Sequence, residues 1–464
     1  MGEHVEGGRL RRLVRFAGVA ARTTRDLLAA EARRRLLGQG EERLEAALGP
    51  TAERLVEVLG SLKGAAAKLG QFISLVDQDT FPEQARRILA RLLSQSPHRI
   101  PYERVGELIA AELGAPPEEL FASFSAEPCA AASLGQVHAA RLKDGREVVV
   151  KVQYPGVERA VESDLRNLGL LARGLALGGG LLDGRQYVAE IEAVLRRELD
   201  YREEARQLAL WREAARPWPQ LVVPEVIAER SAQRVLTLER LAGPTLLEFA
   251  EDPQAGEQQR FEVGARLVEA IWGPFLRQGL IHADPHPGNY IVLPQGRLGV
   301  LDFGATRQLS PRFVLAYWKL VTEALAGKPR DLVAILETAG FRIEGEREQA
   351  RAWLDGLAAI VERPLAPSYD WGQCRIAIHC REHATRHLGT ALRCRAPVES
   401  LMFYRAAAGL AGDLRLLRAR GPFRAVLERT IATARAHLAP ELRAHAPPGL
   451  FEQQAAGHQE QAAA

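Results

Sequence analysis

A short segment in the second half of the chain constrains the fold more than any other. It begins with His-Ala-Asp-Pro-His-Pro-Gly-Asn at residues 282–289, and Asp-Phe-Gly follows at residues 302–304. Between the two motifs, apolar stretches at 290–293 and 298–301 flank a Pro-Gln-Gly-Arg sequence. Short apolar runs on either side of a turn sequence predict two strands joined by a tight turn. Such a hairpin would hold two aspartates and an asparagine in a fixed arrangement.

The types and spacing of these polar residues suit phosphoryl transfer from a nucleotide. That reaction uses a carboxylate that faces the acceptor, together with an amide oxygen and a second carboxylate that hold Mg²⁺. Asp284 stands where the acceptor-facing aspartate of a protein kinase stands, and Asn289 follows it by five residues. Asp302 would then be the second carboxylate. An incidental Asp-Phe-Gly is the alternative, but two motifs at kinase spacing are much more specific than one tripeptide.

A strand upstream supplies the lysine that a kinase-like site requires. Residues 147–152 read Glu-Val-Val-Val-Lys-Val, and a kinase presents the lysine that contacts the α- and β-phosphates from a strand of this kind. Only six lysines occur among the 61 lysines and arginines. In so arginine-rich a chain, a lysine indicates a place where a compact ammonium fits and the fork-shaped guanidinium does not. We single out Lys151 and Lys68; a water-facing edge-strand lysine is the alternative for Lys151.

The strand pair that precedes Lys151 should carry a loop that covers the phosphates. Such loops are normally rich in glycine, so that backbone N–H groups can approach the nucleotide. Residues 128–138 instead read Pro-Cys-Ala-Ala-Ala-Ser-Leu-Gly-Gln-Val-His, with alanines in place of the expected glycines. A strand at 234–239 leads into a hinge where adenine would meet backbone groups. The nucleotide contacts predicted from this loop and hinge are Ala130, Ala131, Ala132, Ser133, Glu239 and Leu241.

With a Lys-Leu-Gly-Gln element far upstream, these motifs resemble the UbiB/AarF atypical kinases, relatives of protein kinases associated with quinone-lipid biosynthesis. The resemblance covers roughly residues 50–430. Six elements occur in order, namely Lys-x-Gly-Gln at 68–71, the Ala-rich segment at 128–138, Lys-Val-Gln-Tyr-Pro-Gly at 151–156, Glu-Leu-Asp-Tyr at 198–201, and the motifs at 282–289 and 302–304. Two residues depart from the pattern: Gln207 stands where the family usually has Asn, and Gly135 where many members have Ala.

The resemblance implies a two-lobed, protein-kinase-like fold of the α+β class. The small lobe would carry an antiparallel sheet, the large lobe would be helical, and an N-terminal helical extension would cover the active site. At 464 residues the chain exceeds one compact core, which agrees with two lobes and an extension. The predicted domains are a basic helical extension at 1–49, a helical lid with the Lys-x-Gly-Gln motif at 50–115, a small lobe at 116–240, a large lobe at 241–440 and a disordered tail at 441–464.

The resemblance also implies roles for individual residues around a bound ATP. Glu204 would pair with Lys151 and orient it, and Asp284 would complete the catalytic set. Asn289 and Asp302 would hold Mg²⁺.

The same resemblance implies a lid over the site. The helix with Lys68, Gly70 and Gln71 would pack where a peptide substrate would otherwise lie. Its lysine would reach the carboxylates of Glu198 and Asp200, because a cation aimed at two anions is a good tether. Solvated helix charges are the alternative for these two acidic residues, which are common near a helix start without any function.

Local patterns predict further elements. Strands are expected at 133–142 and 146–153, joined by a Lys-Asp-Gly turn, and at 221–228. A helical stretch is expected from 157 to about 207. After Gly304 the chain soon enters an apolar helix, so the long activation segment of a regulated protein kinase is missing.

One predicted helix contains several histidines and cysteines, for which packing is favoured over zinc binding; they are Cys374, His379, Cys380, His383 and His387. His282 and His286 are expected to act as hydrogen-bond scaffolding for Asp284.

Composition bounds the partners and the compartment. The net charge is +3, and the chain lacks the aromatic-interleaved basic stripe that would indicate a nucleic-acid partner. Four cysteines without a paired framework suit a reducing cytoplasm. No uncharged apolar run approaches the length of a transmembrane segment. Arginines alternate with apolar residues over 9–35, which predicts a basic amphipathic helix. This helix could contact the inner face of a membrane peripherally, or it could pack on the rest of the domain. The sequence favours neither alternative.

Three functions remain open. The first is a Mg²⁺-dependent atypical kinase or ATPase that acts on a small molecule or lipid, such as a quinone precursor, and supports ubiquinone or isoprenoid-quinone biosynthesis. The second is a conventional protein kinase, which the missing activation segment and the lid argue against. The third is a nucleotide-binding scaffold for a biosynthetic complex, which would have no chemical need of Asp284. A homodimer and such a complex are both open as assemblies.

Overall fold

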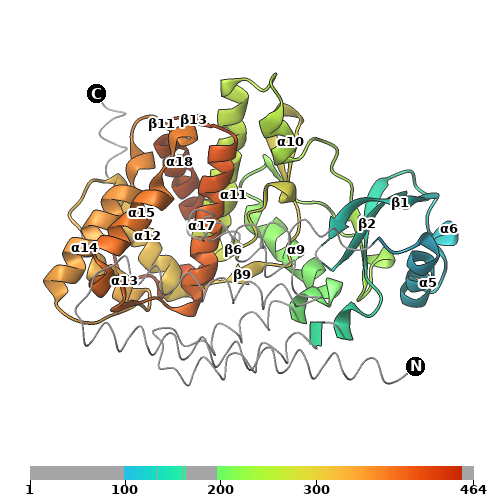
Figure 1. Cartoon of the computed structure of the whole chain (residues 1–464), viewed down its shortest axis with the longest axis horizontal. Coiled ribbons are helices and arrows are strands. Elements are labelled where there is room, and N and C mark those ends of the chain that lie inside the picture. The colour runs from blue at the N-terminus through green and yellow to red at the C-terminus, as the bar shows by residue number, and fades with distance from the viewer. Residues whose placement is uncertain (1–98, 133, 160, 163–195, 452–464) are drawn as a thin grey trace, which may run out of the picture. The chain divides into compact units, whose positions relative to one another are not determined.

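The computed structural model describes residues 99–132, 134–159, 161–162 and 196–451. The chain divides into two compact units, and Figure 1 shows it as a ribbon coloured along the sequence. The first unit comprises Met1–Ala205 and Glu225–Arg240, and the second comprises Arg206–Pro224 and Leu241–Ala464.

A four-stranded sheet forms the framework of the first unit. Its strand order is β1-β2-β3-β5, and all neighbouring strands are antiparallel. Gly145, with a φ of 93°, provides the left-handed residue in the turn between β2 and β3. The strands are β1 (Ser123–Ala132), β2 (Gly135–Arg141), β3 (Glu147–Gln153) and β5 (Val235–Glu239). The predicted antiparallel sheet of the small lobe is confirmed.

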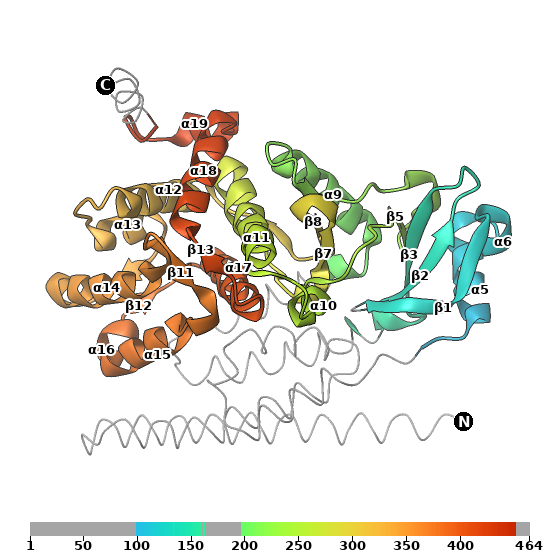
Figure 2. The ribbon, with the colours of Figure 1, turned by 90° about the horizontal axis from the view of Figure 1, so that it is seen from above.

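The alternation of side chains along β3 decides which face of this sheet is covered. Its valines at alternate positions join a buried cluster with α5 (Tyr102–Leu113), and Figure 2 shows α5 and α6 (Pro117–Leu120) beside the sheet. The most deeply buried members of the cluster are Val105, Ile109, Val148, Val150, Val152 and Val235. Because successive side chains of a strand point to opposite faces, Lys151 lies on the other face of β3.

The second unit is mostly helical and is built around α11 (Glu257–Gln278). This helix contacts α17 (Val398–Leu416) and α18 (Phe423–Ala436), which lie beside it in Figure 1. Phe275 of α11 and Phe403 of α17 have ring centroids 4.9 Å apart in the core. Other helices of this unit are α10 (Leu246–Glu251), α12 (Pro311–Leu325), α13 (Leu332–Thr338), α14 (Arg347–Val361), α15 (Ile376–Arg386), α16 (Leu388–Ala391) and α19 (Pro440–His445). The predicted helical large lobe is confirmed.

The predicted catalytic hairpin is also confirmed. Its strands β7 (Tyr290–Leu293) and β8 (Arg297–Val300) pair antiparallel. Two further strands flank the motifs, since β6 (Leu280–His282) pairs with β9 (Thr306–Gln308). Helix α12 begins directly after β9, at Pro311. The connection after Asp-Phe-Gly is therefore short, as the sequence predicted.

The strand predicted at 221–228 for the small lobe is wrong. The observed strand β4 (Leu221–Val222) lies in the second unit, where it pairs in parallel with β8. Val226 makes only an isolated bridge to Leu238 of β5. Pro224 separates the two parts, because proline has no N–H to donate to a ladder.

The described part of the helical stretch predicted from 157 to about 207 contains a break near its C-terminal end, and a helix begins just after Asp200. Residues 196–198 are helical, but the helix stops there and α9 (Tyr201–Ala215) starts anew. Oδ1 of Asp200 accepts the N–H of Arg202 at 2.9 Å. Local bonds of this kind compete with continuation of a helix and favour a new start.

The predicted disordered tail begins too early. Helix α19 occupies Pro440–His445, and Leu442 is only 2% exposed. Proline at the first helical position is a common helix start. Farther on, the ring of Phe451 lies 5.1 Å from that of Trp318. Burial of these apolar groups extends the ordered chain beyond residue 440.

Some predictions concern residues outside the described ranges. These include the basic helix at 9–35, most of the lid, the end of the tail, and the site residues Lys68, Gly70, Gln71 and Ser133. The contact of Lys68 with Glu198 and Asp200 and the placement of the extension over the site therefore stay predictions. Within the described residues, no helix is long and apolar enough to cross a membrane.

Candidate active site

Lys151 and Glu204 form the centre of the candidate site in the first unit. Nζ of Lys151 lies 2.5 Å from Oε1 of Glu204, which belongs to the first turn of α9. The two side chains are 13% and 8% exposed, and a lysine so deeply placed requires a carboxylate because an isolated buried charge is costly. The predicted pairing is confirmed. The catalytic roles of the two residues stay predictions.

Two hydrogen bonds tie the start of α9 to its surroundings. Nε2 of Gln153, at the end of β3, donates to the carbonyl of Glu198 at 3.1 Å. The N–H of Tyr201 donates to the carbonyl of Gln233 at 2.9 Å. These bonds fix the first turn of the helix, and with it the position of Glu204.

The Ala-rich segment is the end of a β-hairpin. Residues 130–132 belong to β1 and pair with residues 135–137 of β2. A Cβ on Gly135 would lie 2.2 Å from the carbonyl oxygen of Val152. Gly135 stands where many family members have Ala. The structure requires glycine at this position, because the neighbouring strand approaches too closely for a methyl group. The predicted contacts of the alanines with a nucleotide stay predictions.

Gln136 and His138, which end the Ala-rich motif, join β2 to other parts of the unit. Nδ1 of His138 donates to the carbonyl of Ser125 at 2.8 Å, and its Nε2 accepts from the amide of Gln136 at 2.8 Å. Burial lowers the pKa of His138 and favours this neutral form. Oε1 of Gln136 accepts the N–H of Ile100 at 3.0 Å. Both motif residues are thus satisfied within the protein.

The predicted hinge follows β5. The N–H of Glu239 donates to the carbonyl of Glu225 at 2.8 Å, and its carboxylate accepts the N–H of Glu225 at 3.2 Å. Leu241, the first residue of the segment that opens the second unit after β5, is partly buried. The contacts of Glu239 and Leu241 with adenine stay predictions.

In the second unit, the carboxylate of Asp284 is bonded at both oxygens. Oδ1 accepts from Nη2 of Arg405 at 2.6 Å, and Oδ2 accepts from Nδ2 of Asn289 at 3.3 Å. The Asn289 amide also donates to the Asp284 carbonyl at 3.0 Å. Asp284 is 3% exposed. Charge-assisted bonds to a buried carboxylate restrict it to one orientation.

Asn289 and Asp302 present oxygen atoms that suit Mg²⁺. The amide nitrogen of Asn289 faces Asp284, so its amide oxygen points away. The N–H of Leu301 donates to the Asn289 carbonyl at 2.8 Å, which brings the following Asp302 close. Asp302 has a φ of 58° and its side chain is only partly buried. Mg²⁺ is commonly held by one or two such groups together with nucleotide phosphates, so these residues fit the predicted metal.

His282 links the two motifs. Its Nε2 donates to the carbonyl of Leu301 at 3.0 Å, and its Nδ1 accepts the N–H of Asp284 at 3.4 Å. Burial lowers the pKa of His282, which keeps the ring neutral and able to accept at Nδ1. Nδ1 of His286 accepts the N–H of Gly288 at 3.0 Å. The predicted hydrogen bond of His282 to Asp284 is present, whereas the His286 side chain contacts Gly288 and its scaffolding role for Asp284 stays a prediction.

Arg405 is the residue that sequence reasoning missed. It lies on α17, 121 positions after Asp284, and no motif of the sequence includes it. One signal was present, because α17 is otherwise rich in alanine, glycine and leucine around this position. An arginine in the buried face of such a helix indicates a buried anion.

The helix with histidines and cysteines packs as predicted. Nε2 of His383 donates to the carbonyl of Trp353 at 2.8 Å, and Nδ1 of His379 lies 2.8 Å from a guanidinium nitrogen of Arg363. In the part of the chain that the structure describes, no group of three metal-ligating side chains is present.

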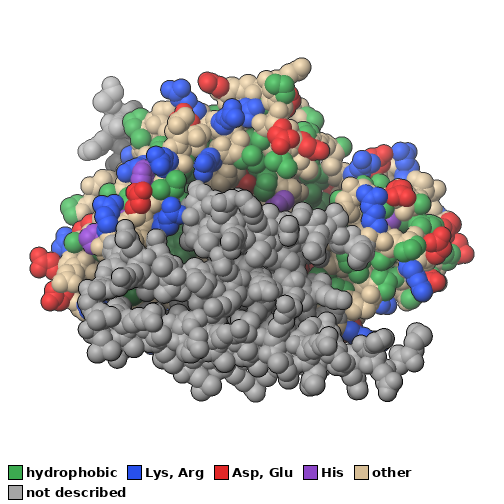
Figure 3. All heavy atoms as spheres, viewed as in Figure 1, with side chains coloured by type: hydrophobic (Ala, Val, Ile, Leu, Met, Phe, Trp, Pro, Cys, Tyr) green, Lys and Arg blue, Asp and Glu red, His purple; other side chains and the backbone are tan. Residues whose placement is uncertain are grey.

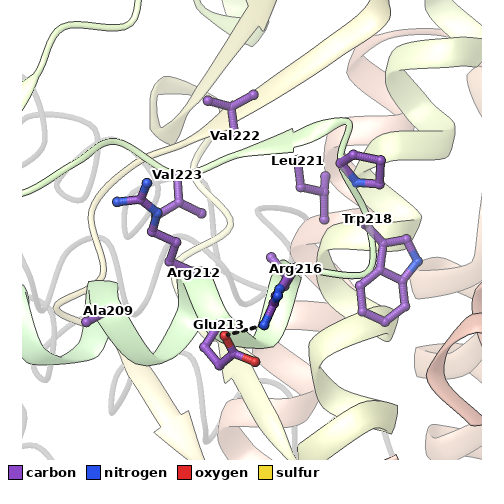
Figure 4. A pocket seen from close by; sticks show the side chains of 10 residues that line it. Ala209, Arg212, Glu213, Arg216, Trp218, Leu221, Val222 and Val223 are labelled. Carbon is purple, nitrogen blue, oxygen red and sulfur yellow. Dashed lines mark ion pairs between the residues drawn. The ribbon is translucent and has the colours of Figure 1, made fainter. Parts of the chain in front are cut away.

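A hollow of about 550 Å³ lies at the end of α9, next to β4, and Figure 4 shows it lined by Trp218, Leu221 and Val223 with Arg212 and Arg216. It includes none of the predicted site residues. On the face shown in Figure 3, basic and acidic side chains are intermixed over the described surface. We assign no ligand to the hollow or to the surface of mixed charge.

Comparison with known families agrees with this geometry. A family model for an ABC1 atypical kinase-like domain matches residues 92–336. Among solved structures, a complex of Rv3197 with erythromycin from Mycobacterium tuberculosis is similar, with a TM-score of 0.59 and 29% identity. The match covers 84% of this chain and 98% of that one.

Curated relatives include two mitochondrial proteins named as atypical kinases. The coq-8 protein of Caenorhabditis elegans is 36% identical over 62% of this chain and 38% of its own length. The COQ8 protein of Saccharomyces cerevisiae is 32% identical over 59% of this chain and 54% of its own length. The chain thus spans less than two thirds of the length of these relatives.

Proposed function

Because this chain belongs to the ABC1 atypical kinase-like family, we propose that it binds ATP with Mg²⁺ and transfers or hydrolyses the terminal phosphate. The observation that carries the proposal is the buried ion pair between Lys151 and Glu204. A lysine held in an apolar strand by a carboxylate presents a fixed ammonium to nucleotide phosphates. Nucleotide binding alone would not need Asp284, so its presence favours turnover over a binding scaffold.

The second unit carries further residues of the proposed chemistry. Asn289 and Asp302 would hold Mg²⁺, which when bound neutralises charge on the phosphates. Asp284 would accept the proton of an acceptor hydroxyl or of water. The short connection between Asp-Phe-Gly and α12 favours a small acceptor over a peptide, because a protein kinase docks its peptide on a longer segment.

We place the acceptor among small molecules or lipids of quinone biosynthesis, with a quinone-precursor phenol as the test compound. This part of the proposal rests on the family resemblance. The basic segment at 9–35 would bring the protein to anionic lipid at the inner face of a membrane. Phosphate release from ATP, measured with and without anionic liposomes and the phenol, tests both points. Release that responds to neither addition would contradict them.

Titration calorimetry tests the metal and base assignments. Asp302→Asn keeps a residue type that tolerates the left-handed backbone, but it removes the carboxylate that the metal needs. We expect it to abolish Mg²⁺-dependent ATP binding. Asp284→Asn should keep the nucleotide while losing turnover. Equal MgATP affinity in the wild type and in Asp302→Asn would contradict the site, and full phosphate release by Asp284→Asn would favour a different base.

A further inference from the structure

The carboxylate that would act as base is held by a cation from a distant helix. Arg405 and Asp284 form an ion pair of 2.6 Å, and each side chain is only 4% exposed. The loop at 282–289 contains no lysine or arginine of its own. In the described structure, a cation that pairs with the base thus comes from α17, outside every motif that predicts the site.

The packing of α17 determines where Arg405 lies. Phe403, two residues earlier, joins an aromatic cluster in which its ring lies 4.4 Å from that of Tyr317. Gly409, four residues after Arg405, lies directly against Pro285. Residues at i and i+4 share one face of a helix, so this face of α17 meets two consecutive residues of the loop at 282–289.

The two oxygens of Asp284 are bonded unequally. Arg405 makes the short bond to Oδ1, whereas Asn289 contacts Oδ2 at 3.3 Å. The shorter, charge-assisted bond from Arg405 therefore holds the carboxylate more firmly than the amide bond from Asn289. A base acts efficiently only when its accepting atom is directed at the proton it removes.

We propose that Arg405 is a positioning residue for phosphoryl transfer. By holding Oδ1 it fixes the orientation of the Asp284 carboxylate toward the hydroxyl or water whose proton this carboxylate accepts, and it balances the charge of the carboxylate. The inference rests on the proposed function. It predicts that loss of Arg405 lowers the turnover number more than it changes MgATP affinity.

Phosphate release from MgATP, with calorimetric MgATP affinity, tests the proposal in the full chain. We expect Arg405→Gln to lower kcat at least about ten-fold while MgATP affinity changes less than about two-fold. Arg405→Lys keeps the positive charge but lacks the planar guanidinium, so its kcat should lie between those of Arg405→Gln and the wild type. Arg415→Gln is the matched control, because Arg415 is exposed on the same helix and should leave kcat unchanged.

A double-mutant cycle of melting temperatures distinguishes a positioning role of Arg405 from a general loss of folded protein. Arg405→Gln removes the ion-pair partner of a buried carboxylate, so it should lower the melting temperature more in the wild-type background than in the Asp284→Asn background. Equal losses in the two backgrounds, or full kcat in Arg405→Gln, would overturn the inference while leaving the proposed function intact. A wild-type chain without MgATP binding or phosphate release would overturn both.

Discussion

Gly409 of α17 lies so close to Pro285 that a Cβ built on it would lie 1.8 Å from the proline Cγ. Such a distance is far inside van der Waals contact, and the glycine is buried. Only a residue without a side chain lets the helix backbone approach the loop at 282–289 this closely. The contact fixes the distance between α17 and the base that Arg405 holds.

Replacing this glycine should separate the helix from the loop. Gly409→Ala should lower both the melting temperature and the turnover number, because either α17 or Pro285 has to move. Gly412→Ala is the control: Gly412 is exposed on the same helix with nothing within 4 Å of a built Cβ. It should stabilise the protein by up to about 1 kcal/mol through helix propensity. A Gly409→Ala protein that melts and turns over like the wild type would contradict the steric argument.

The ion pair of Lys151 and Glu204 should be sensitive to the loss of either partner. Lys151→Met or Glu204→Gln removes the ion-pair partner of a buried charge, which destabilises by about 3 kcal/mol in comparable pairs. Both variants should also lose MgATP affinity in calorimetry. The double variant removes both charges, so it should melt above either single variant while still failing to bind the nucleotide. Additive losses of stability in the double variant would show that the two residues are not coupled.

Asp413 of α17 predicts a pH dependence of stability. Burial raises the pKa of this carboxyl well above its usual range, and its Oδ2 has no hydrogen-bond partner in the described structure. Above about pH 4 the unfolded chain has released this proton, whereas the folded chain keeps it. Stability from this group is therefore lost as pH rises toward the folded pKa.

The substitution Asp413→Asn removes the titration and keeps the shape. The melting temperature of the variant, minus that of the wild type, should become more positive between pH 4 and pH 8. Asp413→Leu, which also cannot titrate, should show the same trend with pH despite its different packing. A difference that stays constant over this range would mean that Asp413 is ionised in the folded protein.

The local parts of the site were predictable from sequence. The hairpin between Asn289 and Asp302, the apolar strand of Lys151 and the short connection before Pro311 all appear as expected. In each case a few neighbouring residues decide the structure, through alternation, turn chemistry or a helix start. The pairing of Lys151 with Glu204, 53 positions apart, came from the family resemblance, because no local pattern specifies it.

Tertiary packing alone determined which distant residues contact the loop at 282–289. Arg405 reaches Asp284 across 121 positions, and β4 joins β8 of the second unit instead of the sheet in which its sequence placed it. Closing such long loops is unfavourable in chain entropy, so these contacts form only where the buried surfaces of α11, α17 and the hairpin fit together. Side-chain type and spacing along the chain carry the chemistry of this site, while the packing of α17 determines the charge that surrounds its base.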